Sequence, residues 1–219
     1  MKLFFKIFLF LIFCHPLSAL ELSYDYTVKT KGLKIGTLFW DLVIADKAYK
    51  TSISLKSRGW ISAIYKFEGK YSSNGNYING FLNTIKYDQY WNTNKKQRNV
   101  SLVFVDKKVF KLRLSPKEKE SPRINYSELK NYNDPITSFI NILLTGKPAK
   151  TIDGRRTYTL HPTKNADHTK IIIKEYINIW ADHKRNNLEY LEFFIDADNF
   201  LPRKINIKFK GSVFSLTKN

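Results

Sequence analysis

The chain has 219 residues and a formal net charge of +18 at pH 7, from 37 Lys and Arg residues against 19 Asp and Glu residues. This length suits one domain with a sizeable hydrophobic core. The single cysteine, Cys14, lies near the N-terminus, so the chain beyond it can form no disulfide, no thiolate metal site and no cysteine nucleophile.

Residues 1–19 have the layout of a secretory signal peptide. Lys2 and Lys6 bracket the start of a Phe, Leu and Ile run that continues to Phe13, and small or polar residues follow as far as Ala19. A membrane-spanning helix needs roughly 20 apolar residues, more than this run has. We therefore expect cleavage after Ala19 and no transmembrane helix in the mature chain. Retention as an anchor and lipidation of Cys14 are the alternatives, the second disfavoured by the bulky Phe13 before it.

Export changes the meaning of the positive charge. Lys and Arg bind phosphate groups, but an exported protein rarely meets nucleic acid, and the basic residues here are scattered along the chain. We therefore expect no nucleic-acid partner. The remaining interpretations are a solvated basic surface and attraction to anionic lipid headgroups, which would give peripheral membrane contact.

Alternation of apolar and polar residues continues from the signal peptide to the C-terminus and predicts β-strands. In the first strand, Leu22, Tyr24, Tyr26 and Val28 share one face. Residues 33–44 begin in alternation and then become apolar on both faces, so we expect this strand to be covered on both sides. Further strands are predicted over residues 49–55, 67–71, 82–91, 100–105, 109–114, 157–160, 171–180, 188–196 and 204–209.

Short turn motifs separate these strands, at Asn74-Gly75, Asn79-Gly80, residues 106–108 and Asp153-Gly154. Asn-Gly and Asp-Gly readily adopt the positive φ angles of hairpin turns. Many short strands joined by such turns favour an antiparallel arrangement. We predict a mainly β fold in a single domain over residues 20–219, built as a curled antiparallel sheet or a half-open β-barrel.

One segment, about 134–145, predicts an amphipathic helix packed on that sheet. Asp134 can cap the first amides, and Pro135 is favoured in the first helical turn. Gly146 is expected to end the helix. Apolar residues recur between them at helical spacing, at Ile136, Phe139, Ile140, Leu143 and Leu144. Residues 59–65 are a candidate for a second, shorter helix.

Several short motifs follow one another in a set order: Tyr24-Asp25-Tyr26, Gly32 to Gly36, Tyr49, Gly59, Tyr65, Tyr71, Gly75, Gly80, Tyr87, the helix start at Asp134, the turn from Asp153 to Tyr158, and residues 198–202. In this order the chain resembles a bacterial exported family catalogued as domain of unknown function 3108. The resemblance covers nearly all of residues 21–217, although a proline expected just after Gly80 is absent. The residues expected in turn or cap positions are Gly32, Gly36, Gly59, Asn74, Gly75, Asp134, Pro135, Gly146, Asp153, Gly154 and Pro202.

The resemblance implies a protein of the Gram-negative envelope, located in the periplasm, and it implies no established reaction and no catalytic residues. More loosely, one helix with many strands is similar to the half-barrel proteins that carry lipoproteins across the periplasm. That similarity concerns the fold and says little about function.

The sequence predicts no catalytic residues, no metal site and no cofactor. His161, His168 and His183 are spaced unlike any compact metal motif and are expected in solvated loops. The sequence contains no Gly-x-Ser-x-Gly element, so it gives no indication of a serine nucleophile. Asp182-His183 could orient an imidazole, but it lies in a predicted polar loop, so a hydrolase is the third alternative below.

If the sheet curls without closing, its concave face would be apolar and could accept an acyl chain, with the helix as plug or lid. The arginines after Gly154 could form a fork for a ligand carboxylate or phosphate, or could pair with neighbouring carboxylates. The predicted ligand-binding residues are Trp40, Trp60, Tyr65, Trp91, Phe139, Ile140, Leu143, Arg155 and Arg156.

The leading hypothesis is therefore non-enzymatic binding of a hydrophobic or amphipathic envelope ligand, either a lipid or an acylated protein. The alternative is an envelope structural or protein-interaction module with a filled core, which would bind an envelope protein through an aromatic patch or an open sheet edge.

Overall fold

The computed structural model describes residues 19–59, 61–64, 66–181, 187–196 and 199–219. Its strands are β1 (Leu20–Thr30), β2 (Leu33–Ala45), β3 (Ala48–Ser57), β4 (Phe67–Ile78), β5 (Phe81–Thr93), β6 (Gln97–Val105), β7 (Lys108–Ser115), β8 (Ala149–Ile152), β9 (Arg156–Lys164), β10 (Thr169–Asn178), β11 (Leu188–Phe194), β12 (Lys204–Phe209) and β13 (Ser212–Lys218). The helices are α1 (Ile61–Ile64), α2 (Pro135–Thr145) and the 3-10 turn η1 (Tyr126–Glu128). Residues 1–18, nearly all of the predicted signal peptide, lie outside the described residues.

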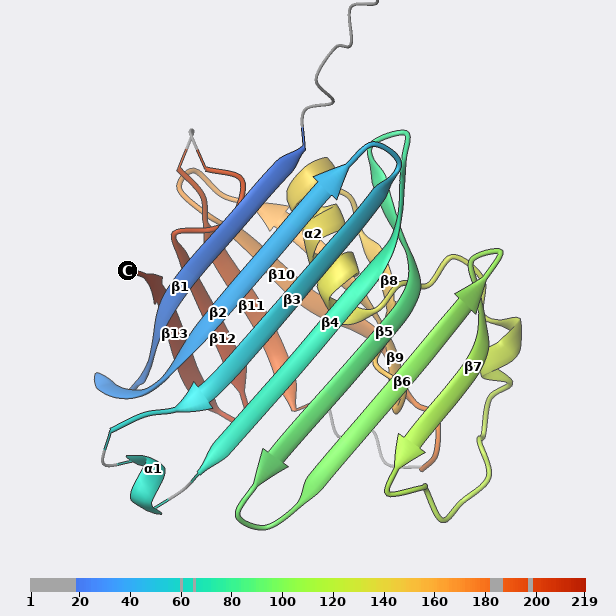
Figure 1. The fold of residues 1–219 in the computed structure, drawn as a ribbon, viewed down its shortest axis with the longest axis horizontal. Helices are drawn as coiled ribbons and strands as arrows, with labels where there is room; N and C mark the ends of the chain where they lie inside the picture. The colour runs from blue at the N-terminus through green and yellow to red at the C-terminus, as the bar shows by residue number, and fades with distance from the viewer. Residues whose placement is uncertain (1–18, 60, 65, 182–186, 197–198) are drawn as a thin grey trace, which may run out of the picture.

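All thirteen strands form one antiparallel sheet, which confirms the mainly β prediction. Their order is β7-β6-β5-β4-β3-β2-β1-β13-β12-β11-β10-β9-β8, so the first and last strands of the chain are neighbours in the middle of the sheet. In Figure 1 the strands β1–β7 form a front layer and β8–β13 a rear layer, with α2 between them. The sheet is curled but open, because within the described residues its end strands β7 and β8 pair with only one neighbouring strand each.

Segments after β7 bridge the gap between the two edge strands. Lys108 of β7 forms an antiparallel bridge with Lys130, and Asn133 forms a parallel bridge with Thr151 of β8. Earlier in the same connection, the Arg123 amide donates to the Ile179 carbonyl at 2.7 Å. The connection from β7 to α2 therefore links the two ends of the sheet without adding a strand.

The concave face of the sheet is buried and the convex face is partly exposed, which makes the prediction for residues 33–44 wrong. In β2, Trp40 is only 3% exposed, whereas its neighbour Phe39 is 37% exposed on the convex face. Nothing in the described structure covers the convex face of this strand, so its apolar side chains remain at the surface.

No helix in the described part of the chain is long and apolar enough to cross a membrane.

Most predicted turns are confirmed, but one is wrong. Asn79-Gly80 joins β4 to β5 with positive φ angles, and Gly32, Gly59, Gly146 and Gly154 also have positive φ. Asn74-Gly75 instead lies inside β4, at a register shift between β4 and β5. A Cβ on Gly75 would lie 2.0 Å from the Asn83 carbonyl oxygen, so the glycine permits close approach of two strands at a bulge.

Two strands, β8 and β13, were not predicted from the sequence. β8 has only four residues and β13 follows directly on β12, through a turn at Lys210 and Gly211 with positive φ angles. Gly36 permits the close approach of β2 and β3, since a Cβ on it would lie 2.4 Å from the Lys56 carbonyl oxygen. Pro202 lies just before β12, and its carbonyl accepts from the Tyr26 hydroxyl at 2.7 Å.

We expect Gly75→Ala to destabilise the fold by about 3 kcal/mol, near the upper end of overpacking costs, because the methyl group would collide with the backbone of β5. Gly32→Ala is the control: its φ is +78° but nothing lies within 4 Å of the added Cβ, so only backbone strain of about 1 kcal/mol should appear. Urea unfolding of both variants measures the difference. Equal losses would contradict the close approach at the bulge.

Candidate functional site

A row of side chains across β2 to β7 forms the floor of the candidate site. The strand register places Trp40 opposite Ile53, Ile53 opposite Tyr71, Tyr71 opposite Gln89, Gln89 opposite Val100, and Val100 opposite Leu114. Directly opposite residues in antiparallel strands point to the same face of the sheet. The concave face therefore carries one continuous row across six strands, apolar or aromatic except at Gln89.

Two adjoining chambers lie over this row. The inner chamber, beneath α2, has a volume of about 350 Å³ and is lined by residues including Trp40, Phe139, Tyr158 and Leu160. The outer chamber, over β3–β7, has a volume of about 1050 Å³, and its lining includes Val100, Leu112, Leu114 and Trp180. Both chambers are lined by Ile53, Tyr71 and Gln89, so they meet at these three residues.

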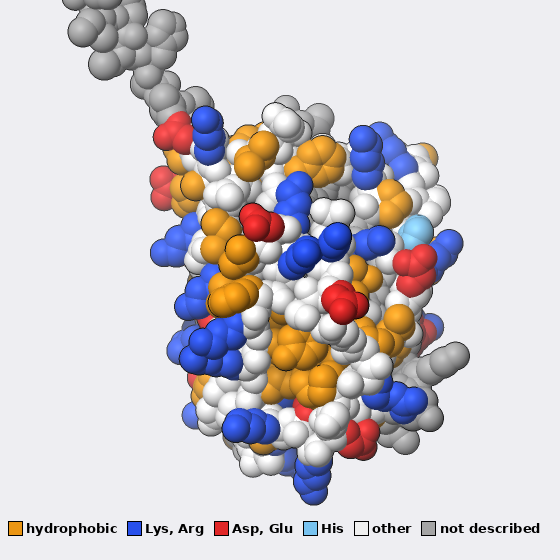
Figure 2. Space-filling view, turned by 90° about the vertical axis from the view of Figure 1, so that its right-hand side faces the viewer, with side chains coloured by type: hydrophobic (Ala, Val, Ile, Leu, Met, Phe, Trp, Pro, Cys, Tyr) orange, Lys and Arg blue, Asp and Glu red, His pale blue; other side chains and the backbone are white. Residues whose placement is uncertain are grey.

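Figure 2 faces the side on which the two ends of the sheet approach each other. Hydrophobic side chains gather in the lower middle of this face, with Lys and Arg side chains to either side. Phe110, on the outer strand β7, is 72% exposed.

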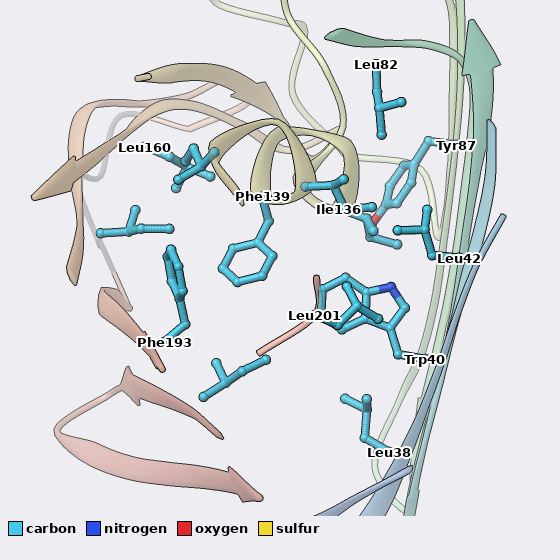
Figure 3. Packing of buried hydrophobic residues seen from close by; sticks show 14 of the residues in the cluster. Leu38, Trp40, Leu42, Leu82, Tyr87, Ile136, Phe139, Leu160, Phe193 and Leu201 are labelled. Atoms are coloured by element: carbon cyan, nitrogen blue, oxygen red, sulfur yellow. The ribbon is translucent and has the colours of Figure 1, made fainter. Parts of the chain in front are cut away.

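Phe139 separates the two layers of the sheet below α2. Its ring centroid lies 5.8 Å from that of Trp40 on β2 and 5.4 Å from that of Phe193 on β11, the second contact being edge to face. In Figure 3 the Phe139 side chain points from the helix into the space between the two layers. The apolar stripe predicted from the sequence thus includes a residue that shapes the inner chamber.

A buried carboxylate fixes the start of α2. Asp134 is fully buried, and its Oδ1 accepts the backbone amides of Ile136 at 2.9 Å and Thr137 at 3.2 Å. Its Oδ2 accepts hydroxyl groups from Thr137 at 2.5 Å, from Ser73 of β4 at 2.7 Å and from Thr84 of β5 at 2.7 Å. The predicted cap is confirmed, and it also binds the helix to the sheet.

A second buried group holds the middle of α2. The Asn141 side chain accepts from the Leu82 amide at 2.8 Å and donates to the Leu82 carbonyl at 2.8 Å. The pairing of β5 with β6 begins only at Lys86, so Asn141 takes the place of a neighbouring strand beside Leu82. With both attachments, α2 is a fixed plug of the curled sheet.

The turn between β8 and β9 packs on the sheet beside the outer chamber. A Cβ on Gly154 would lie 2.5 Å from Val100 Cγ1 of β6, so this turn packs directly on the concave face. Asp153 Oδ1 accepts the amides of Arg155 at 2.8 Å and Arg156 at 2.7 Å. The Trp180 indole donates to the Gly154 carbonyl at 3.1 Å and lines the chamber.

The two predicted fork arginines are paired with protein carboxylates. Arg155 Nε lies 2.6 Å from Glu118 Oε1, and Arg156 lies 3.4 Å from Asp153 Oδ2. This is the arrangement that the sequence offered as the alternative to a ligand fork. A ligand carboxylate would have to compete with Glu118 or Asp153 for them.

The structure divides the other predicted binding residues into three groups. Trp40 and Phe139 line the inner chamber. Trp91 packs on Gly69 and stacks on Phe67 at 6.1 Å, Ile140 is fully buried, and Leu143 lines a separate pocket near His168. Trp60 and Tyr65 lie outside the described residues, as do Asp182 and His183.

Sequence reasoning missed Tyr71, Gln89 and Val100 as site residues. Each lies on the concave face only because of the long β3–β4–β5–β6 register, and the predicted turn at Asn74-Gly75 concealed that register. The spacing of Tyr87, Gln89 and Trp91 on one face of β5 is the signal that could have indicated Gln89.

The histidines are placed partly as predicted. His168 lies in the turn before β10, with its Nδ1 2.7 Å from Asp167 Oδ1. His161 lies in strand β9, so its prediction as a loop residue is wrong. Among the described residues, no group of three or more His, Cys, Asp or Glu side chains is placed to hold a metal ion.

Burial raises the pKa of five core tyrosines well above the ordinary value near 10. Loss of hydration is the largest cause in each case, and the Asp134 carboxylate adds to it for Tyr49 and Tyr87. The five are Tyr26, Tyr49, Tyr71, Tyr87 and Tyr158.

Searches of protein-family models, curated protein sequences and solved structures returned no match to this chain. The resemblance to domain of unknown function 3108 and the looser likeness to lipoprotein-carrying half-barrels therefore stay predictions.

We expect Asn141→Ala to lower the free energy of unfolding by about 2–3 kcal/mol, because the buried amide and carbonyl of Leu82 lose their partner. Asn76→Ala is the matched control, since Asn76 is exposed on β4, and it should change the stability by less than about 0.5 kcal/mol. Chemical denaturation measures both. A similar small loss in the two variants would refute the anchoring role of Asn141.

The fold should unfold cooperatively in alkali. The native state retains tyrosine protons that the unfolded chain releases near pH 10, so stability is fully present below about pH 10 and falls as the pH rises further. Tyrosinate absorbance should rise in two phases, the second coinciding with loss of the near-ultraviolet circular dichroism signal. The same titration in concentrated urea should show one phase. Ionisation of all tyrosines near pH 10 without unfolding would contradict the burial.

Proposed function

We propose that the protein binds a hydrophobic or amphipathic ligand of the cell envelope in the two adjoining chambers and catalyses no reaction on it. The observation that carries this proposal is the pair of apolar chambers on the concave face, which adjoin at Ile53, Tyr71 and Gln89. Its volumes fall in the range of small-molecule sites, roughly 300–1000 Å³. An apolar chain enters such a site favourably because its surface leaves water.

The proposed location is the periplasm of a Gram-negative bacterium. The signal-peptide layout of residues 1–19 and the family resemblance support it. In that compartment the abundant amphiphiles are lipids and acylated proteins, so we propose one of these as the ligand. The basic exterior supports contact with anionic lipid headgroups during exchange.

The alternative, an interaction module with a filled core, fits the chambers less well. One feature favours a protein partner nonetheless: β7 is an outer strand of the sheet, and its Phe110 is 72% exposed. An open strand edge can add a strand from a partner. The hydrolase hypothesis requires carboxylates or Asp182-His183 to meet within hydrogen-bond reach in a cleft, and Asp182-His183 lies outside the described residues.

Native mass spectrometry of the protein after periplasmic expression tests the proposal directly. We expect a bound mass that denaturation releases. In parallel, the uncharged fluorophore N-phenyl-1-naphthylamine, which brightens in apolar surroundings, should bind the delipidated protein and be displaced by alkyl ligands. A clean apo mass together with no fluorophore binding would reject the proposal.

Ile53→Trp should weaken binding of this fluorophore by about tenfold, because the larger ring would occupy the junction of the two chambers and displace about 1.4 kcal/mol of apolar contact. Lys50→Trp is the matched control, since this exposed residue of the same strand lies on the convex face, lines neither chamber and should leave affinity unchanged. Thermal unfolding should show that both variants remain folded. Equal affinities in the two variants would place the fluorophore elsewhere.

A further inference from the structure

Arg98 differs from the other arginines near the outer chamber. It is half-buried on the concave face of β6, opposite Trp91 and two residues before the chamber-lining Val100, a step of about 7 Å along the strand. Among the described residues, no carboxylate forms an ion pair with it, whereas Arg155 is paired with Glu118 and Arg156 with Asp153.

The chain brings these three arginines together at one rim. Gly154 packs on Val100, which places Arg155 and Arg156 of the β8–β9 turn beside the start of β6. The pKa of Arg98 is lowered, first by burial and then by the positive charge of Arg155, and Glu118 offsets this only in part. Lys117, which also lines the outer chamber, adds a further cation.

The cluster of Arg98, Arg155, Arg156 and Lys117 lies next to the apolar row, and together they form one elongated site. From Trp40 on β2 to Val100 on β6 the row crosses four inter-strand steps, about 19 Å along the sheet. A shape of this length suits an extended alkyl chain. The unpaired guanidinium of Arg98 belongs to the same face of β6, about 7 Å along the strand from Val100 and within reach of the polar end of a chain that ends there.

We infer that the ligand is a single-chain anionic amphiphile, whose alkyl chain lies along the Trp40–Val100 row and whose carboxylate or phosphate group binds Arg98. The inference rests on the proposed function and adds the charge and the orientation of the ligand. Arg98 has donors to spare for a bidentate contact with either anion. Glu118 and Asp153 partly neutralise Arg155 and Arg156, so the preference for an anionic ligand depends mainly on Arg98.

Three ligands with the same alkyl chain test the inference: dodecanoate, dodecyl phosphate and 1-dodecanol, each measured by displacement of N-phenyl-1-naphthylamine. The wild-type protein should bind at least one of the two anions about tenfold more tightly than the alcohol. Arg98→Gln should remove this preference while leaving the affinity for 1-dodecanol within about twofold. The anion with the larger preference identifies the headgroup as carboxylate or phosphate.

Two variants serve as controls. Lys111→Gln removes one positive charge from the convex face of β7 and should leave all three affinities unchanged. Arg98→Lys keeps the charge and should retain a preference for the anions, reduced by loss of bidentate geometry. Circular dichroism and thermal unfolding establish that each variant is folded.

The outcomes separate the inference from the proposed function. If the wild-type protein binds 1-dodecanol as tightly as both anions, or if Arg98→Gln weakens all three ligands equally, the inference is wrong and the proposed apolar site stands. If neither the fluorophore nor any alkyl ligand binds the wild-type protein, the proposed function fails and the inference fails with it.

Discussion

Asp134 joins the local structure of the helix to the architecture of the whole sheet. A carboxylate that leaves water loses several kcal/mol of hydration, and the loss is offset only when hydrogen-bond donors surround it. Two backbone amides of α2 and the hydroxyl groups of Thr137, Ser73 and Thr84 supply them. Because Ser73 and Thr84 belong to β4 and β5, the carboxylate is satisfied only when the helix begins against these strands.

The cavity follows from this attachment. With its start held by Asp134 and its middle by Asn141, α2 holds Phe139 between Trp40 and Phe193. The ring keeps the two layers apart below the helix, where no other helix of the described structure fills the space. The chambers are therefore a consequence of a helix that plugs one part of a long curled sheet and leaves another part open.

The sequence was sufficient where the determining interactions are local. The Asp134 cap and the Gly146 end belong to short segments, and the helix was predicted to within one residue of its observed range. Asn79-Gly80 and Asn74-Gly75 have the same turn chemistry, yet only the first forms a hairpin. At the second dipeptide, strand β4 continues and pairs with both β3 and β5. Pairing with two neighbours outweighs the local preference of a dipeptide.

The candidate site was less predictable, because it depends on register. Trp40 and Phe139 were proposed from their apolar surroundings and do line the inner chamber. Tyr71, Gln89 and Val100 join them only through pairings between residues far apart in the sequence. The partner of Arg155 became known only with the path of residues 116–133, which brings Glu118 to the β8–β9 turn.

The same reasoning changes what the net charge of +18 means. Charges on the convex surface are surrounded by water and salt, and those farther apart than about 10 Å hardly influence one another at ordinary ionic strength. Arg98 stands instead beside an apolar chamber, where a lower effective dielectric constant strengthens its attraction for an anion. In the proposed complex, selection of the ligand therefore depends on one guanidinium beside an apolar row, while the many surface lysines affect encounter with a membrane.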